Sequence, residues 1–286
     1  MTPRRRPSGA PRADGALVPN GPRKRFGQHF LTDPNILGRI ADAALLEPGD
    51  TVIEVGPGRG TLTDALRARA ARVIAIEVDR DLVAELEARY AGDASVSVVA
   101  GDVLKTPPGS LGGGAPGGYV LVGNVPYYIT TPIIFQALEA PRPKRAVFLV
   151  QREVADRIVA PPGGKTYGSL SVNVRAFARA ELLFGVKAGA FQPAPSVESA
   201  VVRLTPLDTP LVPPDLESSF RGFVQDVFGL RRKQMRRVMR TLTGRSPGEV
   251  DALLARAGVD PAARPETLPV ERFADLARAV QDARLA

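Results

Sequence analysis

Short apolar runs recur between residues 50 and 150, and a stretch rich in Ala, Leu and Arg follows most of them. These runs are continuously apolar, as strands buried on both faces should be: TVIEV, VIAIE, VSVVA, YVLVG and AVFLV. Their alternation with helical stretches predicts a parallel sheet with helices on its two faces. We therefore expect an open, doubly wound α/β fold.

The pattern changes beyond these runs. RAFARAELLFGV and SAVVRLTPL indicate two more strands, which we expect to pair antiparallel at one edge of the sheet. PLDTPLVPP then has the composition of a linker. Four segments with helical periodicity follow and predict a small helical bundle: ESSFRGFVQDVF, RRKQMRRVMRTLT, PGEVDALLARAG and ERFADLARAVQDARLA. The expected domains are residues 23–206 and 207–286.

Composition narrows the class of protein. The chain has 286 residues, of which 44% are hydrophobic and 24% charged, with no cysteine and a single histidine. Disulfides and thiolate metal sites are therefore excluded, and we expect no metal cofactor. No apolar run reaches the ~18 residues that a membrane span needs. MTPRRRPSGAPR lacks the apolar stretch of a secretion signal, so we expect a cytoplasmic protein that has no membrane partner.

The formal net charge of +8 is concentrated at the N-terminus. Residues 1–25 hold seven Lys or Arg and one acidic residue, Asp14. Because Pro, Gly, Arg and Ala dominate the composition of this N-terminal stretch, we expect residues 1–22 to form a disordered basic arm. Such an arm either touches an anionic partner or stays solvated.

A second basic concentration lies in helical sequence, where residues 218–245 hold eight basic residues and one acidic residue. At 100° per residue, residues 224–242 predict one amphipathic helix with no acidic partners at i±4. We expect its cationic side to bind the phosphates of a nucleic acid, the alternative being a solvated basic face. The residues concerned are Arg232, Lys233, Arg236, Arg237 and Arg240.

The segment TVIEVGPGRGTLTDAL places three glycines between a predicted strand and a predicted helix. At Gly56, Gly58 and Gly60 bare backbone can approach a ligand. Their Gly-x-Gly-x-Gly spacing and the stiff Pro57 favour S-adenosylmethionine over a dinucleotide, whose motif is Gly-x-Gly-x-x-Gly.

Two carboxylates follow the next two predicted strands. Glu77 ends the second strand, where an acidic side chain can accept both ribose hydroxyls of an adenosine. Asp102 follows the third strand, where a carboxylate could accept a hydrogen bond from the adenine amino group. The alternatives are a helix cap for Glu77 and a turn for Asp102.

The fourth strand runs into Asn-Val-Pro-Tyr, at the edge where open α/β sheets bind ligands. The exocyclic nitrogen of adenine is a weak nucleophile because its lone pair is delocalised into the ring. An enzyme must therefore accept hydrogen bonds from its N–H groups. Asn124 and the carbonyl of Val125 can do so. Pro126 stiffens the turn, and Tyr127 offers a stacking face for an extruded base. The alternative is an ordinary turn with a surface tyrosine.

From about Arg23 to the C-terminus, the sequence resembles the small-subunit ribosomal RNA adenine N6,N6-dimethyltransferases of the KsgA type. The segments that carry the resemblance are KRFGQHFLTDPNIL, IEVGPGRGTLT, AIEVD, AGDVL, NVPYYITTPI, QREVADRI, TYGSLSV, FQPAPSVESAVVRL and LRRKQMRR. It implies a Rossmann-like methyltransferase domain, with residues 124–127 as the catalytic loop, and a helical domain that docks on RNA. It also implies cofactor contacts from His29, Leu31, Gly56, Glu77, Asp102 and Asn124. Position 29 departs from the family, which usually has Asn there.

The resemblance further implies a substrate. A monomer would dimethylate N6 of two adjacent adenosines in the 3′-terminal hairpin loop of 16S rRNA, within the 30S subunit or its late precursor. S-adenosylmethionine would be the cofactor, and the role would be in ribosome biogenesis. Two alternatives stay open. One is a 23S rRNA adenine N6-methyltransferase of the macrolide-resistance type, and the other is an assembly or transcription factor with little catalysis.

Overall fold

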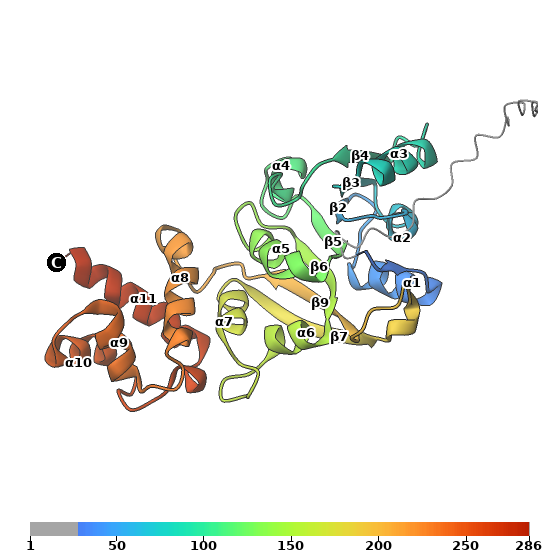
Figure 1. Cartoon of the computed structure of the whole chain (residues 1–286). Coiled ribbons are helices and arrows are strands. Elements are labelled where there is room, and N and C mark those ends of the chain that lie inside the picture. Colours follow the sequence, from blue (N-terminus) through green and yellow to red (C-terminus); the bar gives the residue numbers. More distant parts are fainter. Residues whose placement is uncertain (1–27, 286) are drawn as a thin grey trace, which may run out of the picture.

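The computed structural model describes residues 28–285, so the basic arm predicted for residues 1–22 lies outside the described residues. The described part is an α/β fold followed by helices, as expected (Figure 1). Within it, no helix is long and apolar enough to cross a membrane.

The main sheet has seven strands in the order β4-β3-β2-β5-β6-β9-β7. Neighbouring strands from β4 to β6 are parallel, whereas β9 and β7 are antiparallel at one edge, as the sequence predicted. The bounds are β2 Thr51–Val55, β3 Arg72–Glu77, β4 Val96–Ala100, β5 Val120–Asn124, β6 Arg145–Gln151, β7 Ala178–Val186 and β9 Ser199–Pro206. Beside them, β1 (Phe30–Leu31) pairs antiparallel with β8 (Phe191–Gln192).

Both faces of this sheet are buried, which explains why its strands are continuously apolar. In β2, Val52 belongs to one buried cluster, while Ile53 and Val55 belong to the other. Residues of α1 and α2 share the cluster of Val52, and residues of α5, α6 and α7 share the opposite one. The helices of this part are α1 Pro34–Ala43, α2 Thr61–Arg67, α3 Arg80–Arg89, α4 Pro108–Leu111, α5 Thr130–Ala137, α6 Arg152–Val159 and α7 Ser169–Arg175.

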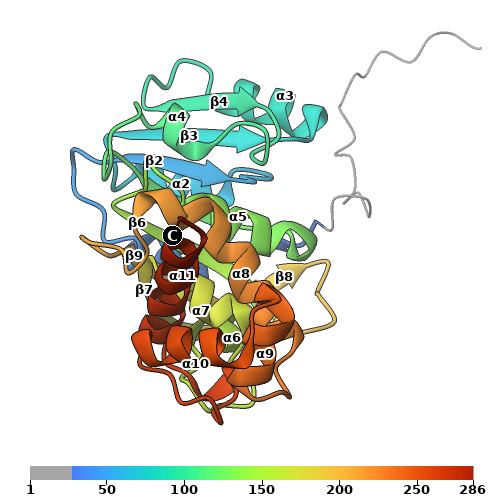
Figure 2. The same ribbon diagram turned by 90° about the vertical axis from the view of Figure 1, so that its left-hand side faces the viewer.

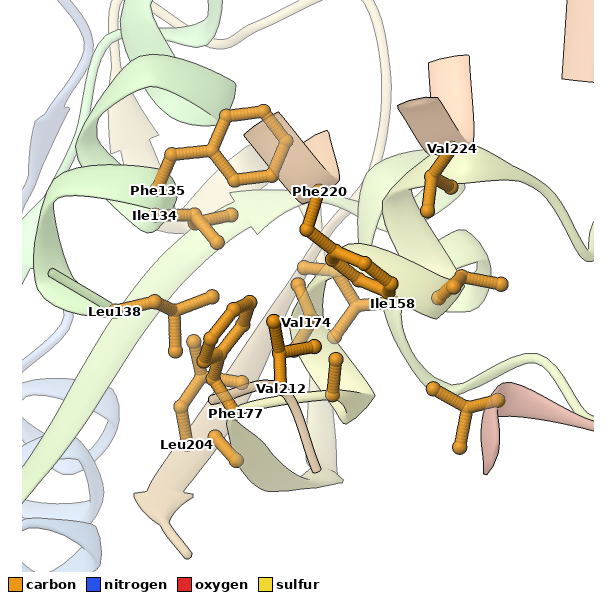
Figure 3. Packing of buried hydrophobic residues seen from close by; sticks show 14 of the residues in the cluster. Ile134, Phe135, Leu138, Ile158, Val174, Phe177, Leu204, Val212, Phe220 and Val224 are labelled. Carbon is orange, nitrogen blue, oxygen red and sulfur yellow. The ribbon is translucent and has the colours of Figure 1, made fainter. Parts of the chain in front are cut away.

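The C-terminal helices lie beside α6 and α7, at the end of the molecule opposite to β4 and α3 (Figures 1 and 2). Phe220 of α8 meets Phe177 edge-on with ring centroids 6.1 Å apart, and Val224 lies on the same side of α8 (Figure 3). One buried cluster therefore continues from the sheet into these helices. Their bounds are α8 Glu217–Gly229, α9 Met235–Thr243, α10 Pro247–Arg256 and α11 Val270–Leu285. The domain boundary at residue 206 stays a prediction.

The interpretation of residues 224–242 as one amphipathic helix is wrong, whereas the two separate helical segments predicted for this part of the chain are confirmed. Helix α8 ends at Gly229, and α9 begins at Met235. The first amides of α9 donate elsewhere, Met235 N to the Ala263 carbonyl at 2.8 Å and Arg236 N to the Pro261 carbonyl at 3.0 Å. Placing residues 224–242 at 100° each does not show this break, because apolar residues on both sides of the turn remain in phase with one helix.

One smaller difference concerns the start of β7. The strand expected from Arg175 begins only at Ala178, because Arg175 is the last residue of α7. The glycine-rich stretch before β5 contains the short helix α4. A side chain on Gly112 would lie 2.6 Å from the ring of Tyr119, so part of this stretch is packed closely.

Tyr167 ties the segment after α6 to the C-terminal helices. Its side chain is fully buried, and its hydroxyl donates to the Leu268 carbonyl at 2.8 Å. Nearby, Gly163 N donates to the Glu266 carbonyl at 2.7 Å. Residues about 100 positions apart are thus joined by two hydrogen bonds, and the buried Leu268 carbonyl depends on the phenol for its partner.

We expect Tyr167→Phe to lower the free energy of unfolding by about 1–2 kcal/mol, because it leaves that carbonyl without a donor. Urea denaturation of the full chain measures the change. Tyr128→Phe is the matched control, because Tyr128 is 61% exposed and loss of its hydroxyl should change stability by less than about 0.5 kcal/mol. Equal stabilities of the two variants would contradict the assigned role of Tyr167.

Candidate active site

A cavity of about 340 Å³ lies at the carboxyl edge of the parallel strands. Its walls come from the loops after β2, β4 and β5, the end of β3, and the β1 segment. The sequence-predicted residues that line it are His29, Leu31, Gly56, Gly58, Glu77, Asp102, Asn124, Val125, Pro126 and Tyr127. Of the predicted cofactor and catalytic residues, Gly60 is not in the lining.

The glycine loop is built on backbone that other residues rarely adopt. Gly56, Gly58 and Gly60 have φ angles of +67°, +58° and +80°. A Cβ on Gly58 would lie 3.0 Å from the ring of Phe30, and one on Gly56 would lie 3.8 Å from the Asn124 carbonyl. Gly60 packs against Tyr90 instead and starts α2. The first two glycines therefore let the backbone form the cavity wall.

Glu77 is held by backbone amides at the cavity wall. It is 5% exposed, and its carboxylate accepts from Val78 N at 2.9 Å, Asp79 N at 3.0 Å and Gly58 N at 3.2 Å. Burial raises the pKa of Glu77 above its ordinary value, while these amides act in the opposite direction. The helix cap, which was the alternative for Glu77, falls to Asp79, whose carboxylate accepts from Asp81 N.

Asp102 lines the cavity and also forms a turn. Its Oδ1 accepts a hydrogen bond from Leu104 N at 3.0 Å. This is the turn that the sequence analysis gives as the alternative role of Asp102. Two aliphatic side chains beside the carboxylates are unusually exposed for a cavity wall, Val78 at 47% and Leu104 at 39%. Such flanks suit a flat aromatic ring. Neither residue is among those predicted from the sequence.

The Asn-Val-Pro-Tyr turn is fixed by hydrogen bonds at each end. Asn124 Nδ2 donates to the His29 carbonyl at 3.0 Å, which leaves Oδ1 as the acceptor of the amide. The Pro126 carbonyl accepts from Ile129 N at 3.1 Å, where the short 3₁₀ helix η2 (Tyr127–Ile129) begins. Burial raises the pKa of Tyr127, and its hydroxyl forms a hydrogen bond with Ser199 Oγ at 2.9 Å.

Glu54 is a site residue that sequence reasoning missed, although a lone acidic residue within the apolar run TVIEV was a signal. It lines the cavity, is 1% exposed, and accepts from the Thr63 hydroxyl at 2.5 Å. Burial raises its pKa to about 8, with the negative charges of Glu77 and Asp64 adding to the shift. Among the described residues, no group of three or more acidic, His or Cys side chains is placed to hold a metal ion.

The predicted RNA-binding residues are all exposed, but they do not share one helix. Arg232 and Lys233 lie in the turn between α8 and α9. Arg236 forms an ion pair with Asp251 of α10, with atoms 2.7 and 3.1 Å apart. The absence of acidic partners at i±4 thus did not mean absence of any partner. Within the described part of the chain, Arg237 and Arg240 on α9 form no ion pair.

Comparison with known proteins gives consistent matches over most of the chain. A family model described as ribosomal RNA adenine dimethylase matches residues 20–282. Ribosomal RNA small subunit methyltransferase A of Moorella thermoacetica is 44% identical, covering 91% of this chain and 93% of that protein. The protein of the same name in Pseudomonas fluorescens is 40% identical, covering 91% and 94%.

Solved structures agree with these relatives. A dimethyladenosine transferase from Plasmodium falciparum has a TM-score of 0.74 and 28% identity, covering 87% of this chain and 96% of that chain. The 23S rRNA methyltransferase ErmE has a TM-score of 0.68 and 29% identity, covering 88% and 99%. Both structures thus cover nearly the same share of the chain, at lower identity than the two relatives above.

The raised pKa of Glu54 predicts a pH-dependent stability. The folded protein holds a proton at Glu54 that the unfolded chain releases above about pH 4.5, so this contribution is complete below that pH. It is lost as the pH rises through about 8. We expect Glu54→Gln, which is neutral at every pH, to remove a loss on the order of 3 kcal/mol between pH 5 and pH 8.5.

Urea unfolding at those two pH values measures the difference. Glu153→Gln serves as the control, because this side chain is 69% exposed on α6 and should leave the pH dependence as it is in the unmodified protein. If Glu54→Gln shows the same fall in stability as the unmodified protein, the buried carboxyl is not the group responsible.

Proposed function

The chain belongs to the ribosomal RNA adenine dimethylase family, and on this basis we propose that it dimethylates two adjacent adenosines of 16S rRNA. The methyl groups pass from S-adenosylmethionine to N6 of each base, in the 3′-terminal hairpin loop. One observation carries the proposal: the glycine loop, two carboxylates and the Asn-Val-Pro-Tyr turn line a single cavity. We assign the glycine-loop side of this cavity to the cofactor and the Asn-Val-Pro-Tyr side to the target adenine.

The residues present fit S-adenosylmethionine. Gly56 and Gly58 present bare backbone to the cavity, and the Glu77 carboxylate would accept hydrogen bonds from the ribose hydroxyls. Asp102 would accept from the adenine amino group, with Val78 and Leu104 beside the ring. Leu31 and the backbone of His29 would complete the site. When bound, the cofactor supplies an electrophilic methyl group.

The remaining wall acts on the target base. Asn124 Oδ1 and the Val125 carbonyl accept hydrogen bonds from the two N6–H groups, which favours a pyramidal nitrogen whose lone pair is free to attack. The ring of Tyr127 stacks on the extruded adenine. No strong base is required if the nitrogen loses its proton after methyl transfer. Asn124 is already oriented by its bond to the His29 carbonyl, so no reordering is needed when the base enters.

Several features support the small subunit as the substrate. The two relatives named ribosomal RNA small subunit methyltransferase A are 44% and 40% identical to the chain, whereas the 23S rRNA methyltransferase ErmE is 29% identical. The intact Asn-Val-Pro-Tyr turn favours retained catalysis over a purely structural role in assembly. We infer that a monomer acts in the cytoplasm on the 30S subunit or its late precursor.

Methyl transfer from labelled cofactor tests the proposed function. Unmethylated small subunits should take up four methyl groups each, on two adjacent adenosines, while protein-free 23S rRNA should remain unlabelled. Asn124→Ala should abolish labelling and keep the circular dichroism spectrum of the unmodified protein, which would show an intact fold. Labelling of 23S rRNA alone would overturn the choice of substrate.

The unpaired basic residues predict where the particle docks. Because Arg236 is neutralised by Asp251, we expect Arg237 and Arg240 to contribute more to phosphate binding. Replacing both by Ala should weaken binding to small subunits and make the log–log salt dependence shallower by about 1.5. Filter binding over a salt series measures this, with Arg236→Ala as the control of smaller effect. Normal binding by the double variant would remove α9 from the docking surface.

A further inference from the structure

The side chain of His29 points to the target-base wall of the cavity. Its ring stacks on the ring of Tyr127, with centroids 5.9 Å apart and planes 25° from parallel. Its Nδ1 lies 2.8 Å from the Pro193 carbonyl, 164 residues along the chain. Since a carbonyl can only accept, Nδ1 carries the proton of this hydrogen bond. Both the face and the donor of the imidazole are therefore engaged with groups other than a cofactor.

We propose that His29 is a positioning residue, which holds the Tyr127 ring in the orientation that receives the extruded adenine. This inference rests on the proposed function and assigns the imidazole to the RNA side of the reaction. The backbone of the same residue still serves the catalytic turn, because its carbonyl receives the Asn124 amide. One residue thus orients both the acceptor of the N6 protons and the stacking ring.

Tyr127 is held at two places. Its hydroxyl meets Ser199 Oγ at 2.9 Å, and Ser199 is 1% exposed at the start of β9. One face of its ring meets His29. A phenol held only through its hydroxyl could still swing about that contact. With the imidazole against one face, the ring is fixed before the base arrives, which reduces the ordering that binding must bring about.

The Pro193 bond fixes the imidazole in turn. Pro193 directly follows β8, whose Gln192 pairs with Phe30 in the small sheet. His29 therefore sits at the end of a paired strand, with its ring tied to the next residue of the partner segment. An asparagine at position 29, the usual family residue, has no ring to stack on Tyr127. The proposed role is thus specific to chains that have an aromatic side chain there.

The single histidine of the chain makes the stacking directly observable. Nuclear magnetic resonance of protein labelled at histidine gives one set of ring signals, which we expect to be shifted upfield by the Tyr127 ring. Tyr127→Leu should remove that shift. Tyr128→Leu changes the exposed neighbouring tyrosine and should leave it unaltered. Ring signals that do not respond to Tyr127→Leu would overturn the proposal, whatever the RNA substrate is.

Kinetics separate the target-base role from a cofactor role. On small subunits, His29→Ala should lower the rate of methyl transfer roughly 3- to 10-fold, the size expected for loss of one aromatic pair. His29→Phe, which keeps a ring but has no donor, should recover most of that rate. The affinity for the cofactor product, measured by calorimetry, should change less than about twofold in both variants. A tenfold loss of that affinity in His29→Ala would assign the imidazole to the cofactor instead.

A double-mutant comparison completes the test. If His29 acts through Tyr127, adding His29→Ala to Tyr127→Ala should not slow single-turnover methyl transfer any further. Additive losses would overturn the positioning role. Failure of the unmodified protein to methylate small subunits would instead defeat the proposed function, and the histidine signals would still report whether the two rings stack.

Discussion

The parallel pairing of β2 with β3 and β5 is the constraint on which the site depends. Val55 is in register with Ile76 of β3 and with Gly123 of β5. The residues that come next along the chain are Gly56, which follows β2, Glu77 of β3 and Asn124 of β5. The three therefore reach the sheet edge at one level. A slip of one residue in either pair would turn every side chain to the other face and separate the cofactor wall from the catalytic turn.

The second requirement is the small sheet of β1 and β8, which brings two distant segments to the cavity. Thr32 N donates to the Ala190 carbonyl at 2.9 Å, and the Thr61 hydroxyl donates to the Leu31 carbonyl at 3.2 Å. The segment before α1 is thereby fastened both to the β8 segment and to the glycine-loop helix. Asn124 depends on this arrangement, because the carbonyl that orients its amide belongs to the same segment.

The C-terminal helices combine apolar attachment with an outward positive charge. Two ion pairs join α8 to the region of α5, Arg142 with Glu217 at 2.6 Å and Arg221 with Glu139 at 3.1 Å, and the same buried cluster runs beneath them. Arg237 and Arg240 have no such partner in the described part of the chain. The basic stretch of residues 218–245 thus supplies Arg221 to the attachment of the helices, and Arg237 and Arg240 to a surface suited to phosphates.

Local sequence determined the strands, the requirement for glycine at positions 56 and 58, and the loops that meet at the sheet edge. These follow from side-chain periodicity and backbone sterics, which act within a few residues. Tertiary structure alone decided the start of α9 at Met235, the neutralisation of Arg236 by Asp251, and the stacking of His29 on Tyr127. Each depends on which distant segment supplies a hydrogen-bond partner, a charge or a ring face, and no local pattern encodes that choice.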